Sequence, residues 1–385
     1  MSVRIDPPDS DDVVVYSAED SVSSKDSVSS KNSVIHTELR HRSPLWMVSQ
    51  EPLLNDLVGY LSHLREELER EPSKHHEIVF SREHLRSCRS AFDRMIRKGE
   101  ESLHRLCELF CNSLVGTYQL QSVVIGETPK NHERFTLTQI LSRQDLYSTI
   151  DLDLGTRQLR KLRYLEGETW VSPYLVANMV EYQPTEPNLH GVHKIISRIK
   201  AEEELWNKVV DEIFGLDSLV TRDKQLRHLS YYVKDIFGIK IVVGTVEEVV
   251  ALHNQLESIC WNPSQLDAVG EPDSERTRAL RFLETKDYLR EAEKQSGWEA
   301  MKSVVLWAGK VFEIQVQPLS NFWREREHLT RESHAGFKSR REQIRQQVAD
   351  QIPLFRFYQS LLRWIIQNPN TEAPSFSGVS VVVRD

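Results

Sequence analysis

An apolar run, residues 236–243 (IFGIKIVV), begins directly after the carboxylate of Asp235. Its length and its β-branched residues are typical of a buried strand. Thr245 and Glu248 follow at the spacing of a helix capping box, and two further β-rich runs flank the turn residues 308–310 (AGK), which predicts a hairpin. The order strand, helix, hairpin, helix predicts an α+β fold in which a mixed β-sheet is flanked by helices.

Helical periodicity predicts further elements on either side of this segment. Leucines recur at helical spacing over residues 53–68, and a second helix is expected after Ser81, a suitable N-cap. Residues 192–214 (VHKIISRIKAEEELWNKVVDEIF) are expected to form a helix with a basic start and an acidic middle. Residues 168–184 fit either a strand or a short buried helix, and an apolar-faced helix is expected over 354–367.

The composition is that of a soluble protein large enough for more than one domain, with 385 residues, 39% of them hydrophobic and 28% charged. Residues 1–44 are serine-rich and contain DSVSSK twice, which predicts a disordered tail. We expect a mostly helical N-terminal region of unassigned role at 45–180. The strand and the hairpin fall in a second domain at 181–349, and a C-terminal helix and tail follow at 350–385.

Charge and hydropathy limit the partners that this chain can have. No apolar run is long enough to span a bilayer, and the first residues (MSVRIDPPDSDD) do not resemble a signal peptide, so we expect a cytoplasmic protein without a membrane partner. A net charge of −8 argues against a protein that coats nucleic acid with its whole surface, although it leaves a local basic groove open.

The cysteines do not predict a metal site. Cys107 and Cys111 are one helical turn apart, but two further ligands at suitable spacing are missing. We expect these two residues, with Cys88 and Cys260, to be small core side chains in a reducing compartment.

Two carboxylates, Asp235 and Glu313, are the residues most suggestive of chemistry. In the second hairpin strand Phe312 and Ile314 share one face, so Glu313 and Gln315 are expected on the other. Two carboxylates that approach each other repel unless a cation lies between them, and magnesium commonly takes one or two carboxylates together with substrate phosphates. A magnesium–nucleotide site is therefore one interpretation, and solvated or salt-bridged carboxylates are the other.

Four short motifs occur in a fixed order between about residues 190 and 340. DIFGIKIV begins at Asp235, KDYL at Lys286, EIQVQP at Glu313, and FW at Phe322 is followed by EH at 327–328; KQSGWEA at 294–300 lies between the second and the third. This succession resembles the synthetase domain of RelA/SpoT-type alarmone synthetases, which are ATP:GTP 3′-pyrophosphotransferases. The corresponding family patterns are D-x-x-G-x-R-x-V, K-D-Y-I with P-K-x-N-G-Y-x-S, E-[IV]-Q-[IV]-R-T and F-W-A-x-x-E-H.

The resemblance implies a nucleotidyltransferase-like core and a GTP pyrophosphokinase-like activity, with ATP as donor, a guanine nucleotide as acceptor and Mg²⁺ as cofactor. Asp235 and Glu313 would hold the metal on the ATP phosphates, and Glu313 would help to deprotonate the attacking 3′-hydroxyl. Trp298 stands where the family has a tyrosine that stacks on the acceptor guanine. The remaining nucleotide-binding positions carry His193, Lys194, Lys200, Lys240, Lys286 and Lys294.

The sequence also departs from the family pattern. The donor-binding R-x-K pattern falls near Gly191 and His193, which do not match it, and Lys240 replaces an arginine. Met301-Lys302 replaces the usual S-L-H, and no His-Asp dipeptide, the mark of the family's hydrolase domain, occurs anywhere in the chain. These departures leave two alternatives: transfer to the 3′-end of an RNA such as tRNA, and a degenerate nucleotide-binding regulator. The helix at 354–366 could join copies into a homo-oligomer or close the monomer's own core.

Overall fold

The computed structural model describes residues 51–128, 133–148, 151–166, 169–199, 209–210, 213–214, 237–289, 299–330, 354–367 and 372–384. All of them belong to one compact unit, which spans 41–385. Across these ranges, no helix combines the length and the apolar character that crossing a lipid bilayer would require.

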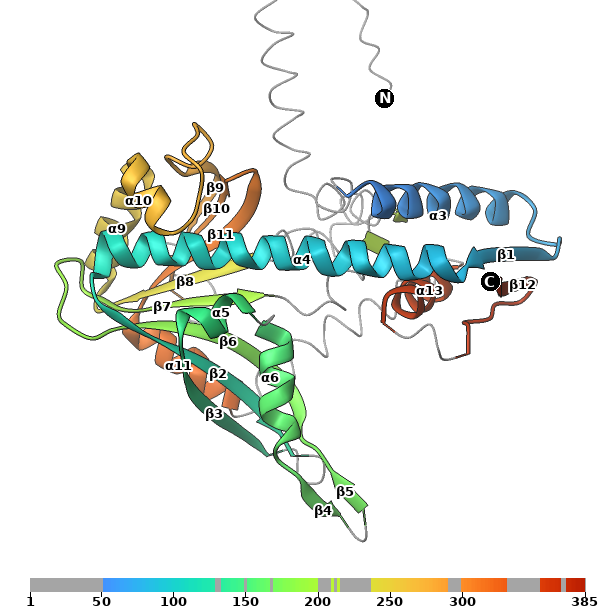
Figure 1. Cartoon of the computed structure of the whole chain (residues 1–385), viewed down its shortest axis with the longest axis horizontal. Coiled ribbons are helices and arrows are strands. Elements are labelled where there is room, and N and C mark those ends of the chain that lie inside the picture. The colour runs from blue at the N-terminus through green and yellow to red at the C-terminus, as the bar shows by residue number, and fades with distance from the viewer. Residues whose placement is uncertain are drawn as a thin grey trace, which may run out of the picture. The chain divides into compact units, whose positions relative to one another are not determined.

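Within the described residues, eight strands form one mixed sheet in the order β3-β2-β6-β7-β8-β11-β10-β9 (Figure 1). Strands β8 and β11 pair in parallel, and the other neighbours are antiparallel. The mixed sheet flanked by helices is the architecture that the sequence predicts. The strands are β2 (Tyr118–Glu127), β3 (Arg134–Leu141), β6 (Tyr174–Pro184), β7 (Val192–Ile199), β8 (Phe237–Val243), β9 (Arg281–Asp287), β10 (Met301–Trp307) and β11 (Lys310–Pro318).

Helices cover the two faces of this sheet. One face packs against α4 (Arg82–Phe110), which continues into a π-helical turn (Cys111–Val115), and against α9 (Val246–Ser258). The other face carries α11 (Leu319–Thr330), and the short α10 (Pro263–Ala268) follows α9 in the chain. The α4 face is apolar, because strand alternation directs residues such as Phe237, Ile241 and Ile314 toward it, and all three are buried.

Three local predictions are confirmed. Ser81 caps α4 by accepting a hydrogen bond from the backbone N–H of His84. Thr245 and Glu248 form both bonds of a capping box at the start of α9. The hairpin turn between β10 and β11 places Ala308 and Gly309 at φ 49° and 72°, the positive values that a two-residue turn between twisted strands requires.

The prediction of a single helix over 192–214 was wrong, since the first eight residues of this segment are strand β7. Helix α4 packs on one face of this strand, and Phe322 of α11 packs with Ile196 on the other. Both faces are therefore covered, and apolar residues occur at adjacent positions such as Ile195 and Ile196. A strand covered on both faces loses the alternation that marks an exposed one, and its pattern then imitates helical spacing.

The N-terminal region supplies strands as well as helices. The sequence of residues 168–184 fits either a strand or a short buried helix. In the structure, this segment contains β5 (Thr169–Val171), which pairs with β4 (Tyr164–Glu166), and β6 of the large sheet. Two short helices, α5 (Arg143–Ser148) and α6 (Asp151–Arg160), precede this hairpin. The large sheet therefore contains strands from both sides of residue 180, and the domain boundary expected there stays a prediction.

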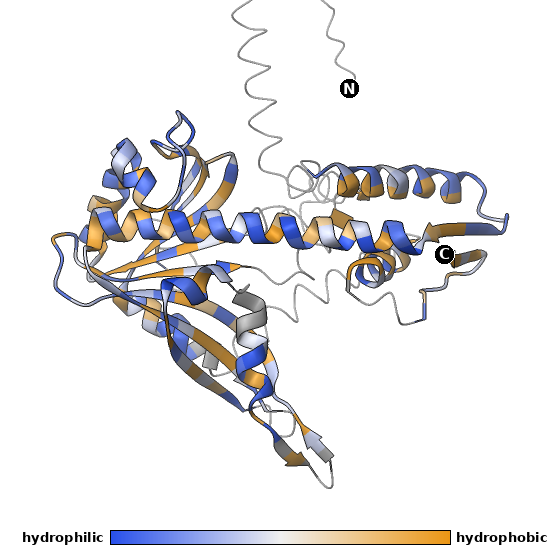
Figure 2. Ribbon diagram, viewed as in Figure 1, coloured by the Kyte–Doolittle hydropathy of each residue, from blue (hydrophilic) through white to orange (hydrophobic). Residues whose placement is uncertain are grey.

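The two ends of the described chain meet around α4. Helix α3 (Pro52–Arg70) buries Leu54, Leu57, Leu61, Leu64 and Leu68, and hydrophobic and hydrophilic bands alternate along it in Figure 2. Helix α13 (Phe355–Gln367) packs on α4, and its Tyr358 hydroxyl donates a hydrogen bond to the carbonyl of Leu61. Strand β1 (His76–Ser81) pairs in parallel with β12 (Val379–Arg384). Most apolar residues of α13 are thus buried in this unit's own core, and so are Cys88, Cys107 and Cys111. Cys260 is exposed, so the prediction that it is a core side chain was wrong.

Candidate functional site

The face of the sheet opposite α4 is polar, and Glu313 lies within it. Residues Glu313, Gln315 and Gln317 alternate with the apolar residues of β11, as the sequence predicts. The Gln315 side-chain amide donates a 2.6 Å hydrogen bond to Glu313 Oε1. Only 4% of Glu313 is exposed, so its carboxylate is a buried charge that needs partners.

Neighbouring strands bring a row of lysines to this carboxylate. Gln315 lies directly opposite Lys302 of β10 on one side and Lys240 of β8 on the other, and Lys302 lies opposite Lys286 of β9. Lysines in one cross-strand row repel each other, so the row is unfavourable unless anions lie over it. We call the residues of this face the polar face: Lys194, Lys240, Lys286, Lys302, Glu313, Gln315 and Gln317.

In the structure, carboxylates already neutralise these lysines. Lys302 forms an ion pair with Glu313 Oε2. Lys286 pairs with Glu284 at 3.1 Å, and Lys194 pairs with Glu181 at 2.7 Å. These bonds stabilise the face without substrate, and phosphate groups would have to exchange with the carboxylates in order to bind the same ammonium groups.

Helix α11 supplies the other polar partners of this face. Its Glu325 pairs with Lys240 and accepts a 3.0 Å hydrogen bond from the Gln317 amide. Its Arg326 pairs with Glu181 at 3.2 Å. Phe322 anchors the helix between these contacts, because it packs in a small apolar cluster on the same face. The polar face is therefore held in place by α11 as well as by the strands.

The predicted site residues fall into three groups. Glu313, Lys194, Lys240 and Lys286 all lie on the polar face. His193 is exposed at a bulge in β7, beside Gly244. Asp235, Lys200, Lys294 and Trp298 lie outside the described residues, so the shared metal site of Asp235 and Glu313 stays a prediction.

Lys302 is the residue that the sequence interpretation undervalued, because it was treated only as a departure from a motif. The hairpin alone could have placed it. A two-residue turn at 308–309 pairs Trp307 with Lys310, and counting back along both strands puts Lys302 opposite Gln315 and on the face of Glu313. The partners Glu181, Glu325 and Arg326 had no comparable signal, since they depend on which strands and helices become neighbours.

Glu313 is a suitable ligand for magnesium, with one condition. Magnesium is commonly bound by one or two carboxylates plus phosphate oxygens, so a single carboxylate among the described residues fits that use. No group of three or more potential ligands from His, Cys, Asp and Glu occurs in this part of the chain. Lys302 contacts one carboxylate oxygen of Glu313 and Gln315 contacts the other. The condition is that one of these two contacts breaks, so that an oxygen becomes available to the metal.

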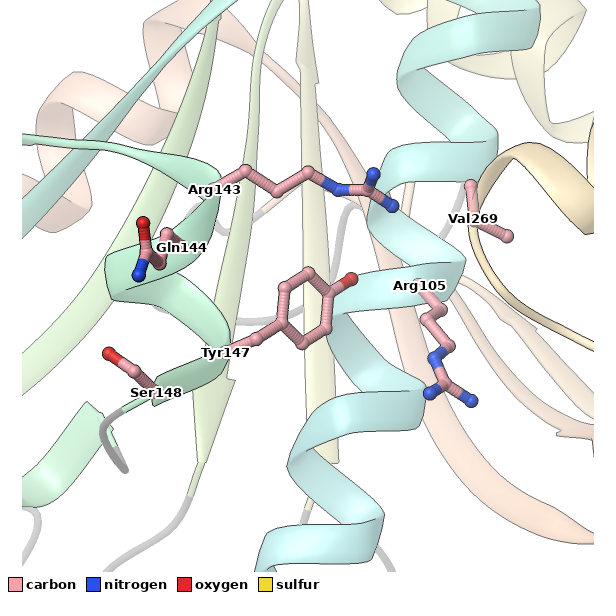
Figure 3. Close-up of a pocket in the computed structure, with 6 residues that line it drawn as sticks. All are labelled: Arg105, Arg143, Gln144, Tyr147, Ser148 and Val269. Carbon is pink, nitrogen blue, oxygen red and sulfur yellow. The ribbon is translucent and has the colours of Figure 1, made fainter.

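A hollow of about 510 Å³ lies elsewhere, on the α4 side of the sheet. Figure 3 shows Arg143 and Tyr147 reaching from α5 toward α4, where Arg105 lies. Arg143 forms two hydrogen bonds with the buried Glu108, which raises the pKa of Arg143, and Arg105 pairs with Glu271 at 2.9 Å. The lysines of the polar face are paired in the same way, but no carboxylate among the described residues lines the hollow, and none of its lining residues belongs to the four ordered motifs. We therefore place the candidate site on the polar face.

Comparisons with known proteins identify no relative by sequence, because neither a protein-family model nor a curated protein matches the chain. Among solved structures, the small alarmone synthetase 1 from Bacillus subtilis bound to its product pppGpp is 19% identical, over 41% of this chain and 80% of that one, with a TM-score of 0.22. Another structure of that synthetase is 18% identical, over 42% and 82%, with a TM-score of 0.21. A likeness at these TM-scores is too low to assign a function to this chain.

Proposed function

We propose that this chain is a magnesium-dependent pyrophosphotransferase that moves pyrophosphate from ATP to the 3′-hydroxyl of a guanine nucleotide. The observation that carries the proposal is the buried carboxylate of Glu313 on a sheet face that also presents Lys240, Lys286 and Lys302. Phosphoryl transfer depends chiefly on positioning and on neutralising phosphate charge, which such a face supplies. The ordered motifs that begin at Asp235, Lys286 and Glu313 support the same reaction.

In this reaction the 3′-oxygen of the acceptor bonds to the β-phosphorus of ATP, and the bond from that phosphorus to the α–β bridging oxygen breaks, so AMP leaves. The hydroxyl proton passes to Glu313 once Lys302 has turned toward a phosphate. Lys240 and Lys286 lie at the two ends of the cross-strand row of lysines, and each binds the phosphate group nearest to it. A bound magnesium ion would supply neutralisation of the triphosphate charge, with Glu313 as one ligand.

A second candidate is a nucleotide-binding protein without transfer activity. One observation favours it: both oxygens of Glu313 are engaged, one by Lys302 and one by Gln315, which leaves the carboxylate poorly placed to accept a proton. In this alternative, nucleotide phosphates would replace carboxylates on Lys240 and Lys286, and no bond would break.

The deciding experiment incubates the purified protein with γ-³²P-labelled ATP, magnesium and GTP, GDP or tRNA, and separates the products. We expect label in a guanine nucleotide and an equal amount of AMP. Glu313→Gln should lower that rate by at least about 100-fold, because it removes the carboxylate while keeping the side chain's shape. GTP binding, measured by calorimetry, should remain.

Glu77→Gln is the matched control, since it removes a carboxylate from the exposed Glu77–Arg384 pair of β1 and β12 and should leave transfer unchanged. If the protein binds nucleotide but releases no AMP from ATP with any of the three acceptors, the second candidate function replaces the first. Label in tRNA alone would keep the reaction and change the acceptor. Circular dichroism melts of each variant exclude unfolding as the cause.

A further inference from the structure

Helix α6 presents a basic surface away from the sheet. Arg157 and Arg160 are three residues apart on one face of the helix, Lys161 directly follows its last residue, and all three are exposed. Leu159 and Gln158 are buried on the sheet side, where the Gln158 amide donates a 3.2 Å hydrogen bond to Ser122 Oγ.

These cations lack the carboxylates that neutralise the polar face. Arg163, also exposed, lies two residues after Lys161. Within the described ranges, none of Arg157, Arg160, Lys161 and Arg163 forms an ion pair or a side-chain hydrogen bond. A chain of net charge −8 thus exposes four unneutralised positive charges within seven residues. Such a cluster attracts a polyanion.

An exposed aromatic residue follows the same cluster. Trp170 of β5 pairs with Leu165 of β4, and these side chains are 62% and 61% exposed. Figure 1 shows α6 leading toward β4 and β5, the strand pair that carries Trp170. Burial of an exposed apolar ring lowers the free energy, and nucleic-acid bases can cover such a ring by stacking on it.

We propose that this surface binds single-stranded nucleic acid. We call it the α6 surface, and it consists of Arg157, Arg160, Lys161, Arg163 and Trp170. The cations would contact successive phosphates, and the Trp170 ring would stack on a base, which requires no particular sequence.

The combination of residues favours a nucleic acid over other anionic partners. An acidic peptide would use the cations but leave Trp170 without a role. A single strand uses both kinds of side chain.

The α6 surface is separate from the polar face. Helix α6 packs on Ser122, which strand pairing places opposite Val180 on the α4 side, whereas the adjacent Glu181 points to the polar face. Binding at the α6 surface therefore does not depend on the proposed transfer reaction, and each can fail without the other.

The test is fluorescence anisotropy of a labelled oligouridylate of about 20 nucleotides with the full chain, titrated between about 50 and 300 mM KCl. With four phosphates neutralised, the slope of log K against log salt should be about −3, from roughly −0.7 per phosphate on a single strand. Replacing Arg157, Arg160 and Lys161 together by glutamine should bring the slope to about −0.7.

Two variants separate the contributions. Trp170→Ala should weaken binding about tenfold with the salt slope unchanged, because it removes stacking and no charge. Replacing Arg86, Arg97 and Lys98 of α4 by glutamine removes the same charge from exposed positions elsewhere and should leave binding unchanged. The proposal is overturned by no anisotropy change at about 50 mM KCl, by equal weakening in the α4 variant, or by binding of phosphatidylserine vesicles without binding of RNA.

Discussion

His253 links three elements of the fold through a buried polar chain. Its Nε2 lies 2.7 Å from Ser303 Oγ of β10, and that hydroxyl lies 3.1 Å from Thr285 Oγ1 of β9. The ring is 3% exposed, and burial lowers the pKa of His253, although Glu257 and Asp287 act in the opposite direction. The folded protein therefore favours the neutral imidazole.

This depressed pKa predicts a loss of stability in acid. The unfolded chain binds a proton on His253 near its ordinary pKa, whereas the folded chain binds it only at lower pH, so stability falls as pH decreases through that interval. We expect the free energy of unfolding to fall as the pH drops below about 7.5, where the unfolded chain begins to bind this proton. His253→Gln, which can still bond Ser303, should show a shallower fall in urea titrations; an equal fall in both proteins would assign the effect to other groups.

At the scale of elements, α4 and β8 are packed around a single glycine. A Cβ on Gly99 would lie 1.9 Å from the Phe237 ring, and Phe237 is itself buried. Gly59 of α3 offers the contrast, because it is exposed and a Cβ there would meet nothing within 4 Å. Both glycines lie inside helices, where alanine has the higher intrinsic propensity by about 1 kcal/mol.

The same substitution should therefore have opposite effects at the two positions. Gly99→Ala should lower the free energy of unfolding by about 1–3 kcal/mol, because the overpacking exceeds the gain in propensity. Gly59→Ala should raise it by up to about 1 kcal/mol. Urea denaturation followed by circular dichroism measures both, and a Gly99→Ala protein as stable as the native chain would show that α4 can move away from β8.

At the scale of the whole chain, residues about three hundred positions apart hold the structure together. Strand β12 pairs with β1 along its length, from His76 with Val379 to Ser81 with Arg384. Arg89 of α4 donates a 2.8 Å hydrogen bond to the carbonyl of Ile365 in α13. A two-stranded sheet is marginal alone, so β1 depends on β12 and on the helices beneath it.

Removing residues 372–385 should destabilise the protein by about 1.5–3 kcal/mol, the contribution of burying one valine such as Val379, and should expose β1 to proteolysis. Thermal melts and limited trypsin digestion, read for new cleavage near Arg82, test this. Arg384→Ala is the control, because it removes an exposed ion pair only and should change stability by less than about 0.5 kcal/mol. An unchanged melt on truncation would show that β12 is dispensable.

The sequence by itself determined the features that a few adjacent residues decide. The Ser81 cap, the Thr245–Glu248 capping box and the turn at Ala308-Gly309 depend on local hydrogen bonds and backbone sterics, and each was predictable. Glu313 lies on the opposite face of the sheet from Phe312 and Ile314, because successive side chains of a strand point to alternate faces. The position of Lys302 on the same face as Glu313 was also predictable, because the two-residue turn fixes the register of the hairpin.

Only the tertiary structure decided what depends on neighbours distant in the chain. Strand β7 imitated a helix because its two covered faces both require apolar residues, and its position inside the sheet sets that requirement. The Arg326–Glu181 pair joins residues 145 positions apart, and Lys240–Glu325 joins residues 85 apart. Such pairs form only after the intervening loops have closed, at an entropic cost that the burial of the whole sheet offsets, and no local pattern records that balance.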